Sequence, residues 1–246
     1  MQKKDNWEPT KFVIRNKKLR VSRNKKNVDI GSRLSVNLIA KKFDKYLPVY
    51  CKGRLIDIGC GQVPLYGTYK AYVSENVCVD WNDSFHEMKH VDVFQNLNEP
   101  FQFEGSLFDT ALLSDVLEHI RLPEQLIGEI YRILKPEGVL IMNVPFMYCL
   151  HETPHDYFRY TRYALESILA LAGFKVLIFE TIGGSPEVLA DVFAKNAKKI
   201  PLIGVPVALF AQWSCFQFVK TKIGRKVSNK TSEKFPLGYF VVAEKR

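Results

Sequence analysis

Short apolar runs that alternate with amphipathic segments constrain the fold of this 246-residue chain more than any other feature. The apolar runs lie at residues 54–59, 76–80, 106–115, 138–146, 174–180 and 238–245. Between two of them, apolar residues recur at helical spacing, at Leu126, Ile127, Ile130, Ile133 and Leu134. Runs without polar alternation are typical of strands buried on both faces of a parallel sheet. The pattern therefore predicts an α/β protein with a doubly wound, Rossmann-like sheet.

Composition and charge indicate an ordinary globular protein with two basic ends. Apolar residues make up 47% of the chain, and the five cysteines form no C-x-x-C pair, which favours a reducing compartment. Residues 1–26 hold ten Lys and Arg against two acids, and residues 195–246 hold eleven against two. The net charge of +9 therefore leaves −8 on residues 27–194. Each end can meet an anionic surface, although lysines also simply keep exposed segments soluble.

The organisation along the chain is a core with two additions. We predict a basic N-terminal arm at 1–31, a core at 32–183, an insertion at 184–235 and the final core strand at 236–246. Ser32 is the expected N-cap of the first helix. The N-terminal residues lack the apolar stretch of a signal peptide, so we expect a cytoplasmic protein.

Candidate ligand-binding residues follow the apolar runs, because ligands of doubly wound sheets lie beyond the carboxyl ends of the strands. Gly59 and Gly61 form a G-x-G turn that lets a nucleotide-like ligand approach the backbone. Pro64 stands where a dinucleotide motif has its third glycine and removes an N–H, which disfavours NAD(P). A P-loop is excluded because no Gly-Lys-Ser/Thr follows.

Polar side chains also end the later runs. Asp80 lies nineteen residues after Gly61, the spacing of a carboxylate that accepts ribose hydroxyls, and this favours binding over an ordinary solvated loop aspartate. Asp92 follows what looks like a short third strand, where an adenine would lie. Ser114 and Asp115 close the run 106–115.

Four segments in order carry a family resemblance: LIDIGCG, Asp80, FDTALLSDVLEHI and RILKPEGVLIMNVP. Over roughly residues 53–180 the chain resembles class I S-adenosyl-L-methionine (SAM)-dependent methyltransferases of the methyltransferase-11 type. The resemblance implies a seven-stranded sheet with strand seven antiparallel and SAM as the cofactor. It also implies the cofactor-binding residues, which are Asp57, Gly59, Cys60, Gly61, Asp80, Trp81, Asp92, Val93, Ser114 and Asp115. Val63 departs from the family, which often has another glycine there, and this leaves the loop shape open.

Residues 151–155 read HETPH and match the zinc-hydrolase motif H-E-x-x-H. That motif needs both histidines on one face of a helix. Pro154 removes a helical donor and pushes Thr153 toward an extended conformation, and the segment directly follows a strand. We therefore predict that this motif binds no zinc and that the protein has no metal site.

The same segment begins a polar loop whose sequence, HETPHDYFRYT, is similar to a run in methyltransferase-11-type proteins associated with glycans and other surface polymers. A hydroxyl acceptor loses a proton when it is methylated, and a histidine suits this step at neutral pH. We predict His155, backed by Asp156, as the base, and His151 as the second choice. The alternative is structural: Asp156 pairs with Arg159 and braces the loop.

Residues 184–235 form an insertion much longer than an ordinary hairpin loop. It holds nineteen mostly apolar residues from Pro201 to Val219 with lysines on both sides, which is long enough to span a membrane. A single crossing would separate the final strand from its own sheet, however. A patch on an anionic membrane surface, a lid or a homodimer surface fits better.

The sequence as a whole predicts a SAM-dependent methyltransferase that methylates an oxygen of a glycan or lipid-linked precursor, cytoplasmic or peripheral on the inner membrane face. The alternatives are a catalytically silent methyltransferase-like binding protein and a methyltransferase of small molecules such as quinones or acyl-carrier substrates. Nucleic acid is disfavoured, because "SDVLE" replaces the Asn/Asp-Pro-Pro-aromatic run of amine methylases and aromatic residues do not interleave with the basic ends.

Overall fold

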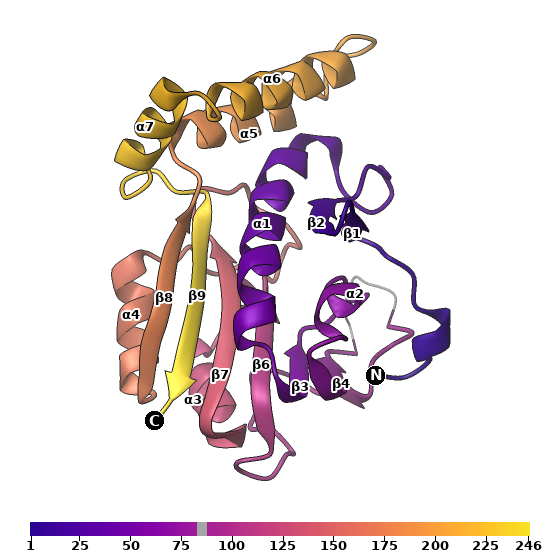
Figure 1. Cartoon of the computed structure of the whole chain (residues 1–246), viewed down its shortest axis with the longest axis vertical. Helices are drawn as coiled ribbons and strands as arrows, with labels where there is room; N and C mark the ends of the chain where they lie inside the picture. The colour runs from indigo at the N-terminus through magenta and orange to yellow at the C-terminus, as the bar shows by residue number, and fades with distance from the viewer. Residues whose placement is uncertain (83–87) are drawn as a thin grey trace.

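The computed structural model describes residues 1–82 and 88–246 (Figure 1). Within them the core is a seven-stranded sheet of order β5-β4-β3-β6-β7-β9-β8. Its strands are β3 (Gly53–Ile58), β4 (Val73–Asp80), β5 (Val93–Phe94), β6 (Phe108–Ser114), β7 (Leu134–Pro145), β8 (Phe174–Ile182) and β9 (Gly238–Lys245). β9 runs antiparallel to β7 and β8, and the other pairs are parallel. The predicted sheet, with its antiparallel last strand, is confirmed.

Helices cover both faces of the sheet, because successive side chains of each strand point to opposite faces. Ile56 and Ile58 pack toward α3 (Pro123–Ile133) and α4 (Arg162–Leu171). Leu55 packs toward α1 (Arg33–Tyr50), on the side where the short α2 (Tyr66–Tyr69) also lies. Pro123 begins α3, at the position where a missing N–H costs nothing. These two apolar layers hold the carboxyl ends of the strands in fixed positions.

The N-terminus of α1 differs from the prediction in its capping. Ser32 stands at the N-cap position, but its side chain does not cap the helix. The hydroxyl of Ser32 lies 3.1 Å from the hydroxyl of Tyr148, in the loop after β7. A long-range contact therefore replaces the local capping hydrogen bond.

The basic N-terminal segment folds onto the core. It contains the turn η1 (Lys4–Asn6), the hairpin strands β1 (Phe12–Arg15) and β2 (Lys18–Val21), and the turn η2 (Ile30–Ser32). Phe12 and Leu19 of the hairpin are buried, and the ring of Phe12 meets that of Phe43 of α1. This packing fixes Lys11, just before the hairpin, near the carboxyl ends of the strands.

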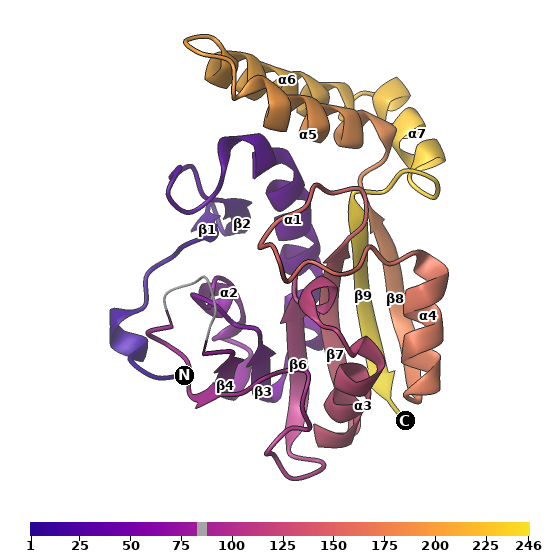
Figure 2. The same ribbon diagram turned by 180° about the vertical axis from the view of Figure 1, so that it is seen from behind.

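Residues 184–235 form three helices beyond one end of the sheet: α5 (Ser185–Ala197), α6 (Gly204–Phe218) and α7 (Lys222–Thr231). α5 and α6 pack as a hairpin that projects past α1 (Figures 1 and 2). The side chain of Gln212 in α6 accepts from the Leu34 N–H and donates to the Ile30 carbonyl, each at 2.8 Å. Across residues 1–82 and 88–246, none of the helices combines the length and apolarity needed to cross a membrane.

Candidate active site

A cavity of about 640 Å³ opens beyond the carboxyl ends of β3, β4 and β6. β3 pairs with β4 on one side and with β6 on the other, so the chain reverses its direction across the sheet at this point. Such a switch point is where doubly wound sheets bind ligands. The predicted cofactor residues that line this cavity are Gly59, Cys60, Gly61, Asp80, Trp81, Ser114 and Asp115.

The turn after β3 depends on glycine. Gly59 has φ +65°, and a Cβ there would lie 2.4 Å from Cγ2 of Val116. Gly61 also has positive φ, as does Val63 two residues later. The left-handed conformation costs little only for glycine, so the sequence G-x-G permits this turn. Val63, where the family often has a glycine, itself adopts this left-handed conformation, and its side chain is buried.

Asp80, at the end of β4, is held by two backbone donors. Its carboxylate accepts from the Gly61 N–H at 2.5 Å and from the Trp81 N–H at 2.7 Å. Asp80 therefore links the turn after β3 to the end of β4 while lying in the cavity wall. An ionised carboxylate accepts more than two hydrogen bonds, so this position suits the diol of a ribose.

Three predicted cofactor residues lie outside the wall of this cavity. Asp57 is buried and accepts from the Tyr69 hydroxyl at 3.1 Å, and burial raises the pKa of its carboxyl to about 7. Asp92 accepts from the Cys78 N–H at 2.8 Å and pairs with the N-terminal ammonium. Val93, in the edge strand β5, pairs with Val79 of β4. The structure thus gives these three residues supporting positions behind the wall, not places in it.

A smaller cavity of about 230 Å³ adjoins the first one at Lys11, Asp115 and Glu152, which line both. The ammonium of Lys11 donates to Asp115 at 2.6 Å across this boundary. The wall of the inner cavity combines apolar side chains with polar groups from η2, α1, β7 and the loops after β6 and β7, among them Ser35, Glu118, Asn143, Tyr148 and His151.

The loop after β7 is braced by Asp156. This carboxylate accepts two hydrogen bonds from Arg159, at 2.6 and 2.7 Å, and one from the His151 N–H at 2.9 Å. Burial alone would raise the pKa of Asp156, but these donors bring it down to about 2. The bracing pair with Arg159, left open as the structural alternative, is therefore present.

The predicted pairing of Asp156 with His155 is wrong. Asp156 Oδ2 lies 3.3 Å from Nδ1 of His151, whereas Nδ1 of His155 lies 2.9 Å from the Tyr157 hydroxyl. The ring of His155 meets Trp81 edge to face and lines the cofactor-side cavity, while His151 lines the inner one. Residues 151–155 are not helical, as Pro154 predicts, so the two histidines face different cavities.

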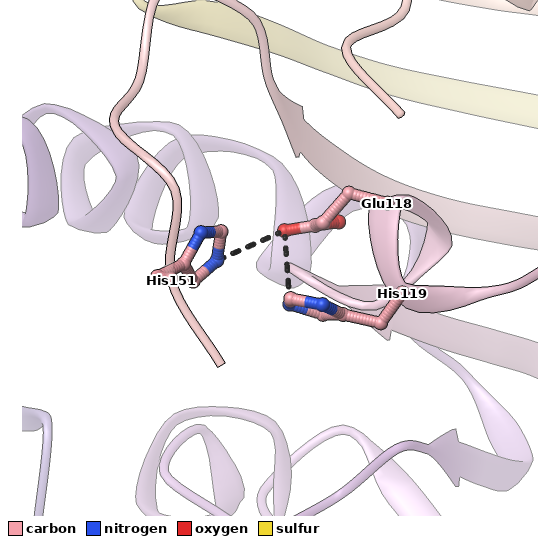
Figure 3. A group of neighbouring side chains, drawn as sticks. All are labelled: Glu118, His119 and His151. Atoms are coloured by element: carbon pink, nitrogen blue, oxygen red, sulfur yellow. Dashed lines mark ion pairs between the residues drawn. The ribbon is translucent and has the colours of Figure 1, made fainter. Parts of the chain in front are cut away.

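His151 instead meets two residues from the turn η3 (Leu117–His119), as Figure 3 shows. Oε1 of Glu118 lies 3.7 Å from Nε2 of His151 and 3.8 Å from Nε2 of His119. Glu118 is fully buried, and burial raises the pKa of its carboxyl. The sequence analysis missed this cluster. The sequence does contain a signal for it, because Glu118 and His119 lie within four residues of the end of the run 106–115, at the ligand edge of the sheet.

Comparison with known proteins agrees with this fold. Residues 56–142 match the family described as "Methyltransferase domain". A SAM-dependent methyltransferase from Archaeoglobus fulgidus is 20% identical, with TM-score 0.56 over 85% of this chain and 93% of that one. One from Mesorhizobium loti is 13% identical, with TM-score 0.52 over 84% and 99%. The [4+2]-cyclase SpnF is 17% identical, with TM-score 0.53 over 85% and 82%. No curated protein matches the sequence.

These comparisons establish the fold of the chain. This chain has the Rossmann-like fold of class I SAM-dependent methyltransferases, and its central 87 residues carry the methyltransferase domain match. The matched region contains the G-x-G turn, Asp80, Glu118 and His119. It ends before the loop that carries His151 and His155, and before the helices α5 to α7.

Proposed function

We propose that this protein is a SAM-dependent methyltransferase that acts on a hydroxyl oxygen. The observation that supports this most is that two cavities adjoin at Asp115. The larger offers the Gly59–Gly61 turn and Asp80 to a nucleoside cofactor, and the smaller offers polar groups such as Glu118 and Asn143 to an acceptor. Methyl transfer needs such neighbouring sites, since the attacking oxygen must lie in line with the bond between sulfur and methyl carbon.

For this methyl transfer, the protein has to position the two substrates and to supply one proton acceptor. The acceptor oxygen forms a bond to the methyl carbon, the carbon–sulfur bond breaks with its electron pair on sulfur, and S-adenosylhomocysteine leaves. The hydroxyl proton passes to a base, for which we propose His155, which faces the boundary from the cofactor side, with His151 of the inner cavity as the second choice. If His155 donates its Nδ1 proton to the Tyr157 oxygen, Nε2 is left to accept.

The proposed acceptor is a glycan or lipid-linked precursor. The inner cavity is lined by carboxylate, amide, hydroxyl and imidazole groups such as Glu118, Asn143 and Tyr148. Apolar residues such as Val36 and Ile39 share this lining, so the polar groups suit the reacting hydroxyl and the apolar ones suit a lipid or other apolar part of the acceptor. A volume of about 230 Å³ would hold the reacting end of such an acceptor, with the remainder outside.

The experiment is methyl transfer from labelled SAM to a panel of nucleotide sugars, lipid-linked sugars and a quinol, with mass analysis of the product. We expect label on a sugar hydroxyl and equimolar S-adenosylhomocysteine. Tight S-adenosylhomocysteine binding without transfer to any acceptor would favour the silent binding protein. Transfer to the quinol alone would favour the small-molecule methyltransferase, and binding of NAD instead of SAM would contradict the proposal altogether.

A further inference from the structure

Glu118 is a buried acid whose carboxylate has no hydrogen-bonding partner. Its exposed fraction is 0%, and neither oxygen accepts a hydrogen bond within the part of the chain that the structure describes. Its contacts with the Nε2 atoms of His119 and His151, at 3.8 and 3.7 Å, are too long for hydrogen bonds. A buried carboxylate without hydrogen bonds is costly, so this position favours a bound cation between Glu118 and the two imidazoles.

We propose that Glu118, His119 and His151 bind a divalent transition-metal ion of the zinc type. The three ligand atoms all lie within 4.8 Å of one another (Figure 3). Ligands on a tetrahedral zinc lie about 3.4 Å apart, given bonds of about 2.0–2.1 Å. The distances of 3.7 and 3.8 Å from Glu118 therefore need to shorten by a few tenths of an ångström, and the widest separation of the three atoms, at most 4.8 Å, by up to about 1.4 Å.

The second nitrogen of each imidazole faces an oxygen atom, which forms a hydrogen bond at His119 but not at His151. Nδ1 of His119 lies 2.6 Å from the His155 carbonyl, and Nδ1 of His151 lies 3.3 Å from the Asp156 carboxylate. Metal-binding histidines commonly turn one nitrogen toward a carbonyl or carboxylate in this way, which presents the other nitrogen's lone pair to the metal. Both Nε2 atoms here face the Glu118 carboxylate.

The ligand set of the cluster, and its place in the cavity wall, suit a catalytic metal ion. Two imidazoles and a carboxylate form the ligand set of several catalytic zinc sites, which keep a further coordination position open. Glu118 and His151 line the inner cavity, and Oε2 of Glu152 lies 3.8 Å from Nε2 of His119 as a candidate fourth ligand. The nearby ammonium of Lys11 is paired with Asp115.

This ion would lie where the acceptor is proposed to react, and it could lower the pKa of the acceptor hydroxyl, a role that rests on the proposed function. His151 would then be a ligand, and His155 would remain the proton acceptor. The proposal departs from the expectation of no metal, which was drawn from residues 151–155 alone. The ligands come from two separate loops, not from H-E-x-x-H.

The test is metal binding by the full chain after treatment with a chelator. Zn²⁺ is titrated by calorimetry and Co²⁺ by visible absorption. We expect one ion per chain with micromolar or tighter affinity, and at least tenfold weaker binding by Glu118→Gln and by His151→Asn. His155→Asn is the matched control in the same loop and should bind as wild type does.

Thermal unfolding separates metal binding from a purely structural role. Glu118→Gln removes a buried charge, so without metal it should melt at the wild-type temperature or higher, yet lose the rise that zinc produces. A wild-type protein that binds neither ion would overturn the proposal. So would binding that Glu118→Gln and His151→Asn leave unchanged, or that His155→Asn weakens as much as they do.

A second inference comes from the helical hairpin of α5 and α6. Large apolar side chains are exposed along it and at its turn, including Leu189 (70% exposed), Leu202 (100%), Phe210 (66%) and Trp213 (57%). An exposed apolar surface of this extent is unusual unless something covers it. Its surroundings are basic: residues 192–235 hold nine Lys and Arg against one acid, Glu233.

We infer that this hairpin docks on an anionic bilayer surface. Lys195 and Lys198 are paired with Asp191 and Asp29, while Lys199 and Lys220 are exposed beside the apolar side chains. Basic groups at an anionic surface contribute favourably while apolar side chains enter the interface. A second copy of the chain would bring the same basic groups together, which opposes a dimer through this face.

Sedimentation with vesicles tests the hairpin. The full chain should sediment with phosphatidylglycerol-containing vesicles more than with pure phosphatidylcholine, and moderate salt should weaken but not abolish this. Leu202→Asp with Phe210→Asp should release the protein, whereas Leu171→Asp, 78% exposed on α4, should not. The inference would be overturned if the wild-type protein sedimented with neither kind of vesicle. It would also be overturned if the wild-type protein formed a stable dimer that the double variant dissociates.

Discussion

Asp80→Asn is the most direct test of the cofactor site. The Asp80 carboxylate sits between the N–H groups of Gly61 and Trp81, at 2.5 and 2.7 Å. An asparagine keeps the size but replaces one acceptor oxygen with a donor, so one of these N–H groups must face an NH₂ group. The same change removes the negative charge that we expect to bind the ribose hydroxyls.

The magnitude follows from the loss of charged hydrogen bonds, which contribute about 1.5–3 kcal/mol each. The Kd for S-adenosylhomocysteine should therefore rise by about 10- to 150-fold, since 1.4 kcal/mol corresponds to a tenfold change. Calorimetry on the full chain measures this, and thermal unfolding without ligand shows whether the loop has lost its support.

Asp92→Asn is the matched control. Asp92 also follows β4 but pairs with the Cys78 N–H and the N-terminal ammonium outside the cavity wall. Its loss should leave the Kd for S-adenosylhomocysteine within about threefold, because it is expected to touch no cofactor atom. The reasoning is refuted if Asp80→Asn binds as tightly as wild type, or if Asp92→Asn loses as much affinity as Asp80→Asn does.

Three further predictions concern the same edge of the sheet. His155→Ala should lower turnover by ~10²–10⁴-fold with nearly unchanged cofactor affinity; an unchanged rate would remove His155 from the chemistry. Burial raises the pKa of Asp57 from 3.8 to about 7, so the folded state retains a proton that the unfolded state releases, and stability falls as the pH rises between these values. Urea unfolding at pH 5 and pH 8 should show this fall in wild type and not in Asp57→Asn. Gly59 has φ +65°, and a Cβ added there would lie 2.4 Å from Val116. Gly59→Ala should therefore lower the free energy of unfolding by about 1–2 kcal/mol in the same assay and should weaken cofactor binding. An unaltered free energy of unfolding would mean that the turn adapts.

The sequence by itself determined the sheet and the cofactor turn. Apolar periodicity is local, and residues such as Leu126 and Ile130 predict a helix whatever the rest of the chain does. The glycines at 59 and 61 likewise report a backbone conformation that other residues avoid. The topology of a doubly wound sheet then brings Asp80, Ser114 and Asp115 to the same edge without further information.

Only the tertiary structure decided which side chains meet across loops. Asp156 is adjacent to His155 in sequence, yet Arg159 and the path of the loop turn its carboxylate toward His151. His151 in turn meets Glu118 because the loop after β7 crosses the turn after β6. Such contacts depend on loop direction and side-chain rotamer, which no pattern within a few residues specifies. The cofactor turn could therefore be predicted from sequence, whereas the cluster at Glu118 required the fold.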